Sequence, residues 1–273
     1  MSAAAASSAP MPAAVPATAP KIRIEGVRKS FASARGRIDA LAAIDLNVAD
    51  GEFICLVGPS GCGKSTLLRI LAELETPSSG RVAIRSTSQQ PAPLTSMVFQ
   101  EASIFPWMTV RENAAYGLWV RGLRDAEAAR TVSHFLELTG LAAFADAYPH
   151  QLSGGMKQRV SVARAFANGP EVLLMDEPFA ALDEQNKILL QEELLRIWEQ
   201  TRTTVLFITH SIDEALVLAD RVLVMSARPG RLIADIPLAF ERPRSVMALK
   251  SDPEYGRISS RIWSLLRSEV VAR

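Results

Sequence analysis

The stretch that decides the fold is "GPSGCGKST", Gly58–Thr66, which has the spacing G-x-x-x-x-G-K-[ST]. It follows the apolar run "EFICLV" (52–57), typical of a strand, and leads into "STLLRILAEL" (65–74), which has a helical pattern. Glycines in a loop between a strand and a helix let backbone N–H groups converge on phosphate oxygens, and the helix N-terminus adds positive potential. The sequence therefore predicts a phosphate-binding loop rather than a glycine-rich turn that carries a lysine by chance.

We expect this loop to bind the phosphates of a nucleotide, with Lys64 reaching the β- and γ-phosphates and the Ser65 hydroxyl binding Mg²⁺. A guanine nucleotide usually requires the motif N-K-x-D. The stretch "NKIL" begins that way but has Leu189 where the aspartate belongs, which favours ATP. The residues of the loop expected to bind ATP are Gly58, Pro59, Ser60, Gly61, Cys62, Gly63, Lys64, Ser65 and Thr66.

The composition is that of an ordinary globular protein. The chain has 273 residues, 48% of them hydrophobic and 22% charged, with a net charge of +1. This balance gives no argument for a nucleic-acid partner, and we expect none. No apolar stretch is as long as the about 18 residues that a membrane-spanning helix needs. The two cysteines, Cys55 and Cys62, are expected to be reduced thiols of a cytosolic protein, because a disulfide would distort the phosphate-binding loop.

The first twenty residues are rich in alanine and proline and carry no charged side chain. They have neither the basic start nor the strongly apolar centre of a secretory signal. We therefore expect a disordered tail over residues 1–20 and one folded domain over residues 21–273.

Strand-like and helical segments alternate along the folded part, which predicts an α/β fold with a mainly parallel core sheet. The runs at 171–177 and 203–210 are almost continuously apolar, as expected of strands buried on both faces. Between about 101 and 167 the pattern turns mostly helical, which indicates a helical insertion. The pair Asp50-Gly51 predicts a hairpin between the two strands that flank it. A terminal helix is expected over about 254–270.

The buried strand in "VLLMDEP" ends in two carboxylates, Asp176 and Glu177. Ligands of parallel sheets bind beyond the carboxyl ends of the strands, so both side chains should face the nucleotide. We expect Asp176 to hold Mg²⁺, directly or through water, and Glu177 to polarise the attacking water. Because Pro178 disfavours helical geometry in the residue before it, Glu177 should have an extended backbone. The alternative is two solvated acids at a strand end.

A second glycine-containing loop, "LSGGMKQR" (152–159), also resembles a phosphate site. Five elements occur in a fixed order: "GPSGCGKST", "VFQE", "LSGGMKQR", "VLLMDEP" and "ITH". Together they resemble the ATP-binding cassette (ABC) ATPases, over roughly residues 21–250. The resemblance implies a P-loop NTPase fold with an N-terminal antiparallel β subdomain and an inserted helical subdomain.

The same resemblance explains the second loop. In this family two copies pair head to tail, as a homodimer or a paired cassette, with ATP at the interface. The resemblance implies that Ser153, Gly154 and Gly155 of one copy cover the γ-phosphate held on Lys64 of the other. It also places Asp183 in a loop that communicates across the dimer.

Further site residues follow from the resemblance alone. Phe31 matches the aromatic residue that stacks on adenine, although a core phenylalanine is the alternative. Gln100 matches a residue that touches Mg²⁺ and the attacking water, and His210 one that contacts the γ-phosphate. The catalytic set implied is Glu177, His210 and Gln100, and the Mg²⁺ set is Ser65, Gln100 and Asp176.

Longer strings, including "IFPWMT" (104–109) and "RPGR", resemble the nitrate/sulfonate/taurine importers. This implies an ATPase at the cytoplasmic face of the inner membrane that works with separate transmembrane permease subunits and, indirectly, a periplasmic substrate-binding protein. We expect "IFPWMT" to meet the membrane subunit, with core packing as the alternative. Another cargo, such as a lipid, and a soluble ABC ATPase without a transport role also remain open. Glu73 and Ala180 depart from the residues, Gly and Ser, that relatives usually carry.

Overall fold

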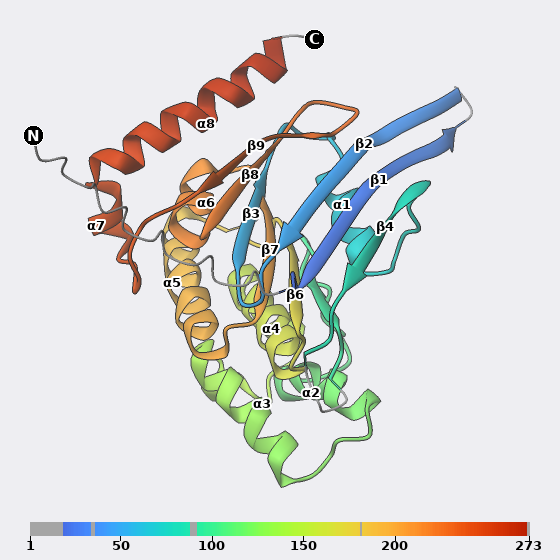
Figure 1. Ribbon diagram of the computed structural model, residues 1–273. Coiled ribbons are helices and arrows are strands. Elements are labelled where there is room, and N and C mark those ends of the chain that lie inside the picture. Colours follow the sequence, from blue (N-terminus) through green and yellow to red (C-terminus); the bar gives the residue numbers. More distant parts are fainter. Residues whose placement is uncertain (1–18, 34–35, 88–91, 181, 272–273) are drawn as a thin grey trace, which may run out of the picture.

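The computed structural model describes residues 19–33, 36–87, 92–180 and 182–271 (Figure 1). Residues 1–18 of the expected tail lie outside this part of the chain. The strands form one sheet of three strands and one of six, and the helices pack around them. In the described residues, no helix is both long enough and apolar enough to cross a membrane.

The six-stranded sheet is the centre of the fold. Its order is β5-β6-β7-β3-β8-β9, and neighbouring strands are parallel except β9, which is antiparallel to β8. Every residue of β3, β6 and β7 is buried, as their continuous apolar runs predict. The strands are β3 (Phe53–Val57), β5 (Thr95–Val98), β6 (Val172–Asp176), β7 (Thr204–Thr209), β8 (Arg221–Met225) and β9 (Leu232–Pro237).

The smaller sheet is antiparallel, with the order β2-β1-β4. Its strands are β1 (Ile22–Ser33), β2 (Gly36–Val48) and β4 (Ser79–Ile84). The predicted hairpin around Asp50-Gly51 is wrong: the turn is present, but β2 pairs with β1, and β3 enters the other sheet between β7 and β8. The reason is that β3 is apolar on both faces, which suits the middle of a parallel sheet and not a half-exposed hairpin.

The predicted helical insertion lies between β5 and β6, at the lower end of the molecule in Figure 1. Its helices are α2 (Val110–Val120), α3 (Ala126–Leu138) and α4 (Gly154–Ala167), with short 3₁₀ turns at Ala142–Phe144 and Pro149–Gln151. A capping box starts α2: Thr109 Oγ1 accepts from the Glu112 N–H (3.2 Å), and Glu112 Oε2 accepts from the Thr109 N–H (2.8 Å).

The remaining helices cover the large sheet. They are α1 (Lys64–Leu71), α5 (Glu184–Thr201), α6 (Ile212–Leu218), α7 (Val246–Lys250) and α8 (Pro253–Val271). Along β3 the side chains alternate between two cores: Phe53 and Cys55 pack into one, and Ile54 and Leu56 into the other. Side chains therefore pack against both faces of the sheet at β3. Cys55 and Cys62 are both buried, and burial raises the pKa of the Cys55 thiol.

The helix that follows the phosphate-binding loop ends without a glycine. Glu73 takes its place and adopts a left-handed backbone, with φ of 58°. The Leu74 N–H donates to the Arg69 carbonyl (2.9 Å), and the Glu73 N–H donates to the Ile70 carbonyl (3.1 Å). These bonds form a Schellman cap, so the helix end keeps the geometry that glycine favours although its residue is a glutamate.

We predict that Glu73→Gly raises the free energy of unfolding, by about 1 kcal/mol, because glycine removes the steric cost of the left-handed conformation. Urea unfolding measures the change. Glu73→Ala is the control, because it removes the same side-chain atoms but keeps a Cβ and the strain. An equal gain in both variants would show that the side chain, and not the backbone, is the source.

Candidate nucleotide-binding site

An open cleft of ≈ 580 Å³ lies at the carboxyl edge of the parallel sheet, over the loop that follows β3. Phe31 comes from β1, Gln100 follows β5 and Glu177 follows β6, so the fold gathers predicted residues from distant parts of the chain. The cleft is lined by Phe31, Ile38, Ala40, Ser60, Gly61, Gly63, Lys64, Ser65, Thr66, Gln100, Glu177 and Arg228.

The phosphate-binding loop depends on glycine at Gly63. Its φ is +106°, and a Cβ there would lie 2.7 Å from the Ala40 carbonyl oxygen. Lys64 is 5% exposed, and its Nζ donates to the carbonyls of Gly58 (2.8 Å) and Pro59 (3.1 Å). The ammonium group is therefore held inside the loop, beside the backbone N–H groups that start α1. This arrangement suits an anion such as a polyphosphate.

Two of the three side chains expected to hold Mg²⁺ are in direct contact, and the third, Gln100, lines the cleft. Ser65 Oγ donates to Asp176 Oδ1 at 2.9 Å. Burial raises the pKa of Asp176, Ser65 lowers it, and the neighbouring carboxylate of Glu177 raises it further. In the described residues no three His, Cys, Asp or Glu side chains form a metal cluster. A hydroxyl, a carboxylate and the Gln100 amide fit Mg²⁺, which is commonly held by few protein oxygens together with water and phosphate oxygens.

Glu177 and His210 pair at the ends of neighbouring strands. Glu177 Oε2 lies 3.2 Å from His210 Nδ1. The expected extended backbone at Glu177 is wrong, since its φ is +45°. Pro178 disfavours only the right-handed helical conformation of Glu177. The Glu177 N–H extends the hydrogen bonding between β6 and β7 by donating to the Ile208 carbonyl (3.0 Å). The resulting left-handed turn leaves the Glu177 side chain lining the cleft.

The second glycine loop lies apart from this cleft. Ser153 caps α4, with its Oγ accepting from the Met156 N–H (3.3 Å), and no residue of the loop lines the cleft. A Cβ at Gly154 would meet no atom within 4 Å, whereas one at Gly155 would lie 3.5 Å from Leu182. The chain itself therefore imposes no steric need for glycine at Gly154.

Asp183 also lies outside the cleft lining and caps α5. Its Oδ1 accepts from the Asn186 N–H (3.1 Å), and its Oδ2 accepts from the Asn186 side-chain amide (2.6 Å). These hydrogen bonds lower the pKa of the Asp183 carboxyl. The structure thus brings Asp183 beside the second glycine loop, through Leu182 and Asn186, and not beside the phosphate-binding loop.

Phe31 is 37% exposed and lies in the wall of the cleft, opposite Ile38 in the register of β1 and β2. Lys29 Nζ lies 4.8 Å from the centre of its ring. The Phe31 side chain is therefore not packed in the core, which was the alternative interpretation of the sequence. The cleft is also lined by residues that were not predicted from the sequence, namely Ile38, Ala40 and Arg228. The string "RPGR" contained Arg228, but its pattern alone gave no reason to place it near the phosphate-binding loop.

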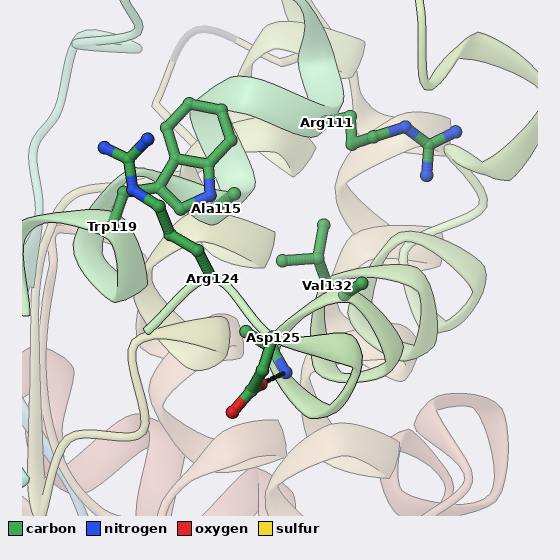
Figure 2. Close-up of a pocket in the computed structure, with 8 residues that line it drawn as sticks. Arg111, Ala115, Trp119, Arg124, Asp125 and Val132 are labelled. Carbon is green, nitrogen blue, oxygen red and sulfur yellow. Dashed lines mark hydrogen bonds between the residues drawn. The ribbon is translucent and has the colours of Figure 1, made fainter. Parts of the chain in front are cut away.

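A second cavity lies between α2 and α3 and contains none of the predicted site residues (Figure 2). Its walls include Ala115, Val132 and Trp119, with the Arg124 guanidinium 5.3 Å from the Trp119 ring centre. Its volume is ≈ 110 Å³. This cavity is too small for a nucleotide, whereas the cleft over the phosphate-binding loop is lined by the predicted residues and is therefore the candidate site.

The family model described as ABC transporter matches residues 41–180. The chain belongs to the ABC transporter family. The expected fold class and family are confirmed, and this ABC protein is an ATP-binding ATPase. Its expected site residues occupy the positions just described.

Two curated relatives illustrate the similarity. The nitrate import ATP-binding protein NrtD of Synechocystis is 45% identical over 254 residues, 90% of this chain and 95% of the relative. The bicarbonate transport ATP-binding protein CmpD of Synechococcus elongatus is 44% identical over 240 residues, 86% of both chains. Among solved structures, the dimeric cassette MJ0796 bound to ADP and Pi has a TM-score of 0.70 at 32% identity, covering 81% of this chain and 100% of that one.

We predict that Glu177→Gln in this ABC ATPase lowers kcat by at least about a hundredfold while ATP binding is retained, because the amide has the same shape but cannot accept a proton. Phosphate release and the Kd for ATP measure the two effects. Glu184→Gln is the control, since Glu184 is exposed and lies outside the cleft lining. Normal turnover in Glu177→Gln would exclude Glu177 as the general base.

Proposed function

We propose that this ABC protein is the ATP-hydrolysing subunit of an importer for a small anion, and that it acts as a homodimer bound to separate membrane subunits. The observation that carries the proposal is the separation of the two glycine loops, because the exposed N-terminus of α4 does not line the phosphate cleft of its own chain. The names of the two relatives support the importer class.

In the proposed reaction, Lys64 and the N–H groups of the loop bind the phosphates of ATP, and Phe31 stacks on adenine. Glu177 accepts a proton from the attacking water, and His210 orients Glu177 through the contact at 3.2 Å. Ser65, Asp176 and Gln100 would hold Mg²⁺. When bound, the metal neutralises charge that develops on the transferring phosphoryl group.

The dimer follows from the second loop. Ser153, Gly154 and Gly155 stand at the N-terminus of α4, where N–H groups and the helix dipole favour an anion. None of these three residues lines the nucleotide cleft of the same chain, so we infer that they complete the ATP site of a second copy. The open space at Gly154 then permits close approach of that copy, with Asp183 near the same contact.

We predict that Ser153→Arg leaves the Kd for ATP of the monomer within about twofold, while abolishing ATP-dependent dimerisation and turnover, because a long cation would enter the interface. Light scattering with ATP and phosphate release measure these effects. Ser260→Arg, on the exposed face of α8, is the control. A variant Ser153→Arg that hydrolyses ATP normally would refute the shared site.

A cluster of aromatic side chains fits the docking of a membrane subunit. Phe105 lies 4.5 Å from Tyr116 and 5.5 Å from Trp107, measured between ring centres. Asn113 fixes the backbone of Phe105 from both sides, accepting from its N–H (2.8 Å) and donating to its carbonyl (3.1 Å). Trp107 is 69% exposed, so core packing does not account for it.

We propose that this contact holds the ABC protein at the cytoplasmic face of the inner membrane as a peripheral subunit, and that a periplasmic binding protein delivers the cargo. The names of the two relatives support an inorganic anion such as nitrate or bicarbonate as the cargo, and a sulfonate such as taurine is the alternative. ATP-driven uptake of each labelled anion into vesicles that contain the partner permease would identify the cargo.

We predict that Trp107→Glu lowers the amount of permease that copurifies with the ABC protein by more than about fivefold and abolishes anion uptake, because a charge would replace the apolar anchor. Trp263→Glu is a matched control, since Trp263 is 61% exposed but lies on α8. Circular dichroism verifies that both variants fold. Full copurification and uptake with Trp107→Glu would place the permease elsewhere.

A further inference from the structure

The turn that joins β8 and β9 packs directly against the phosphate-binding loop. A Cβ at Gly230 would lie 2.1 Å from the Cys62 carbonyl oxygen, so a glycine is needed for this approach. The Gly230 N–H donates to the Ala40 carbonyl (3.0 Å), and the Gly230 carbonyl accepts from the Ala42 N–H (2.9 Å). The turn is therefore fixed between the phosphate-binding loop and β2.

Arg228 extends from this turn into the nucleotide cleft. Its Nε donates to the Gly61 carbonyl at 3.1 Å, and its Nη2 lies 3.5 Å from the position that a Cβ on Gly61 would take. The side chain lines the cleft together with Ser60 and Lys64. Within the described residues, Arg228 forms no ion pair with an aspartate or glutamate. Its charge is thus available to an anionic ligand.

The terminal helix braces the same turn. Glu269 of α8 accepts a hydrogen bond from the Ala227 N–H at 2.9 Å through its Oε2. In Figure 1, α8 runs from α7 toward the end of β8 and β9 at which the turn lies. On the other side of the turn, the Arg231 N–H donates to Ser226 Oγ (3.0 Å). The backbone on both sides of Arg228 is therefore held in place.

We propose that Arg228 is a further nucleotide-binding residue that contacts the phosphates of ATP, and that Glu269 is a positioning residue that holds Arg228 there through the turn. ATP carries several negative charges, and Lys64 is the cation that the loop itself supplies. A guanidinium offers five N–H donors, of which Nε is used by Gly61, and the others suit phosphate oxygens.

Contact with the phosphates fits the position of Arg228 better than contact with adenine. Arg228 touches Gly61 of the phosphate-binding loop, whereas Phe31 and Ile38 form a separate part of the cleft wall on β1 and β2. The inference requires only that the chain binds ATP. It does not depend on the cargo, the membrane partner or the dimer, so it can fail while the proposed function stands.

The test measures ligand affinity in the Glu177→Gln background, in which ATP should stay intact. We expect Arg228→Gln to raise the Kd for ATP and for inorganic tripolyphosphate by roughly tenfold, and the Kd for AMP much less. Arg231→Gln is the matched control: it lies in the same "RPGR" string but outside the cleft lining, and should change neither affinity. Unchanged affinity for ATP, or an equal loss for AMP, would overturn the phosphate contact.

Glu269 is tested by a double-mutant cycle. Glu269→Ala should raise the Kd for ATP several-fold, whereas Glu269→Gln keeps an acceptor oxygen and should restore most of the affinity. If Glu269 acts through Arg228, adding Glu269→Ala to Arg228→Gln should cause little further loss. Thermal unfolding checks that the fold is intact. Fully additive losses, or no rescue by glutamine, would overturn the positioning role.

Discussion

The close packing of two glycines against backbone carbonyls is the constraint on which the site depends. Gly63 of the phosphate-binding loop approaches the Ala40 carbonyl, and Gly230 of the β8–β9 turn approaches the Cys62 carbonyl. At both positions a single methyl group would collide with backbone, which cannot move away as a flexible side chain can. The loop is therefore held between the antiparallel sheet and the turn, and α1 begins in a fixed direction.

The rest of the site follows from that fixed loop. Phe31 reaches the cleft because β1 and β2 lie beside the loop, and Gln100 and Glu177 reach it because parallel strands end at one edge. Each chain thus presents two surfaces: the cleft for the phosphates, and the exposed N-terminus of α4, which does not line that cleft. The proposed dimer joins these two surfaces, which would make ATP hydrolysis depend on the association of two copies.

The chemistry of the site could be predicted from the sequence because it resides in short local patterns. A glycine-rich loop between a strand and a helix, followed later by a buried strand that ends in two carboxylates, specifies phosphate binding whatever the surroundings. The pairing of β2 with β1 could not be predicted in this way. Asp50-Gly51 forms a turn in either arrangement, and the partner of β3 is chosen by burial on both of its faces.

The backbone conformations of Glu177 and Glu73 also separate what local sequence sets from what tertiary contacts set. Pro178 excluded a right-handed helical Glu177, but only the hydrogen bond to Ile208 on β7 selects the left-handed turn over an extended strand. Glu73 adopts a glycine-like conformation because the cap of α1 requires it. The sequence by itself determined the phosphate-binding loop, the acids and the α/β class, since these depend on neighbouring residues. Only the tertiary structure decided the strand partners, the turn at Glu177 and the approach of Arg228 to Gly61, because contacts between distant segments set them.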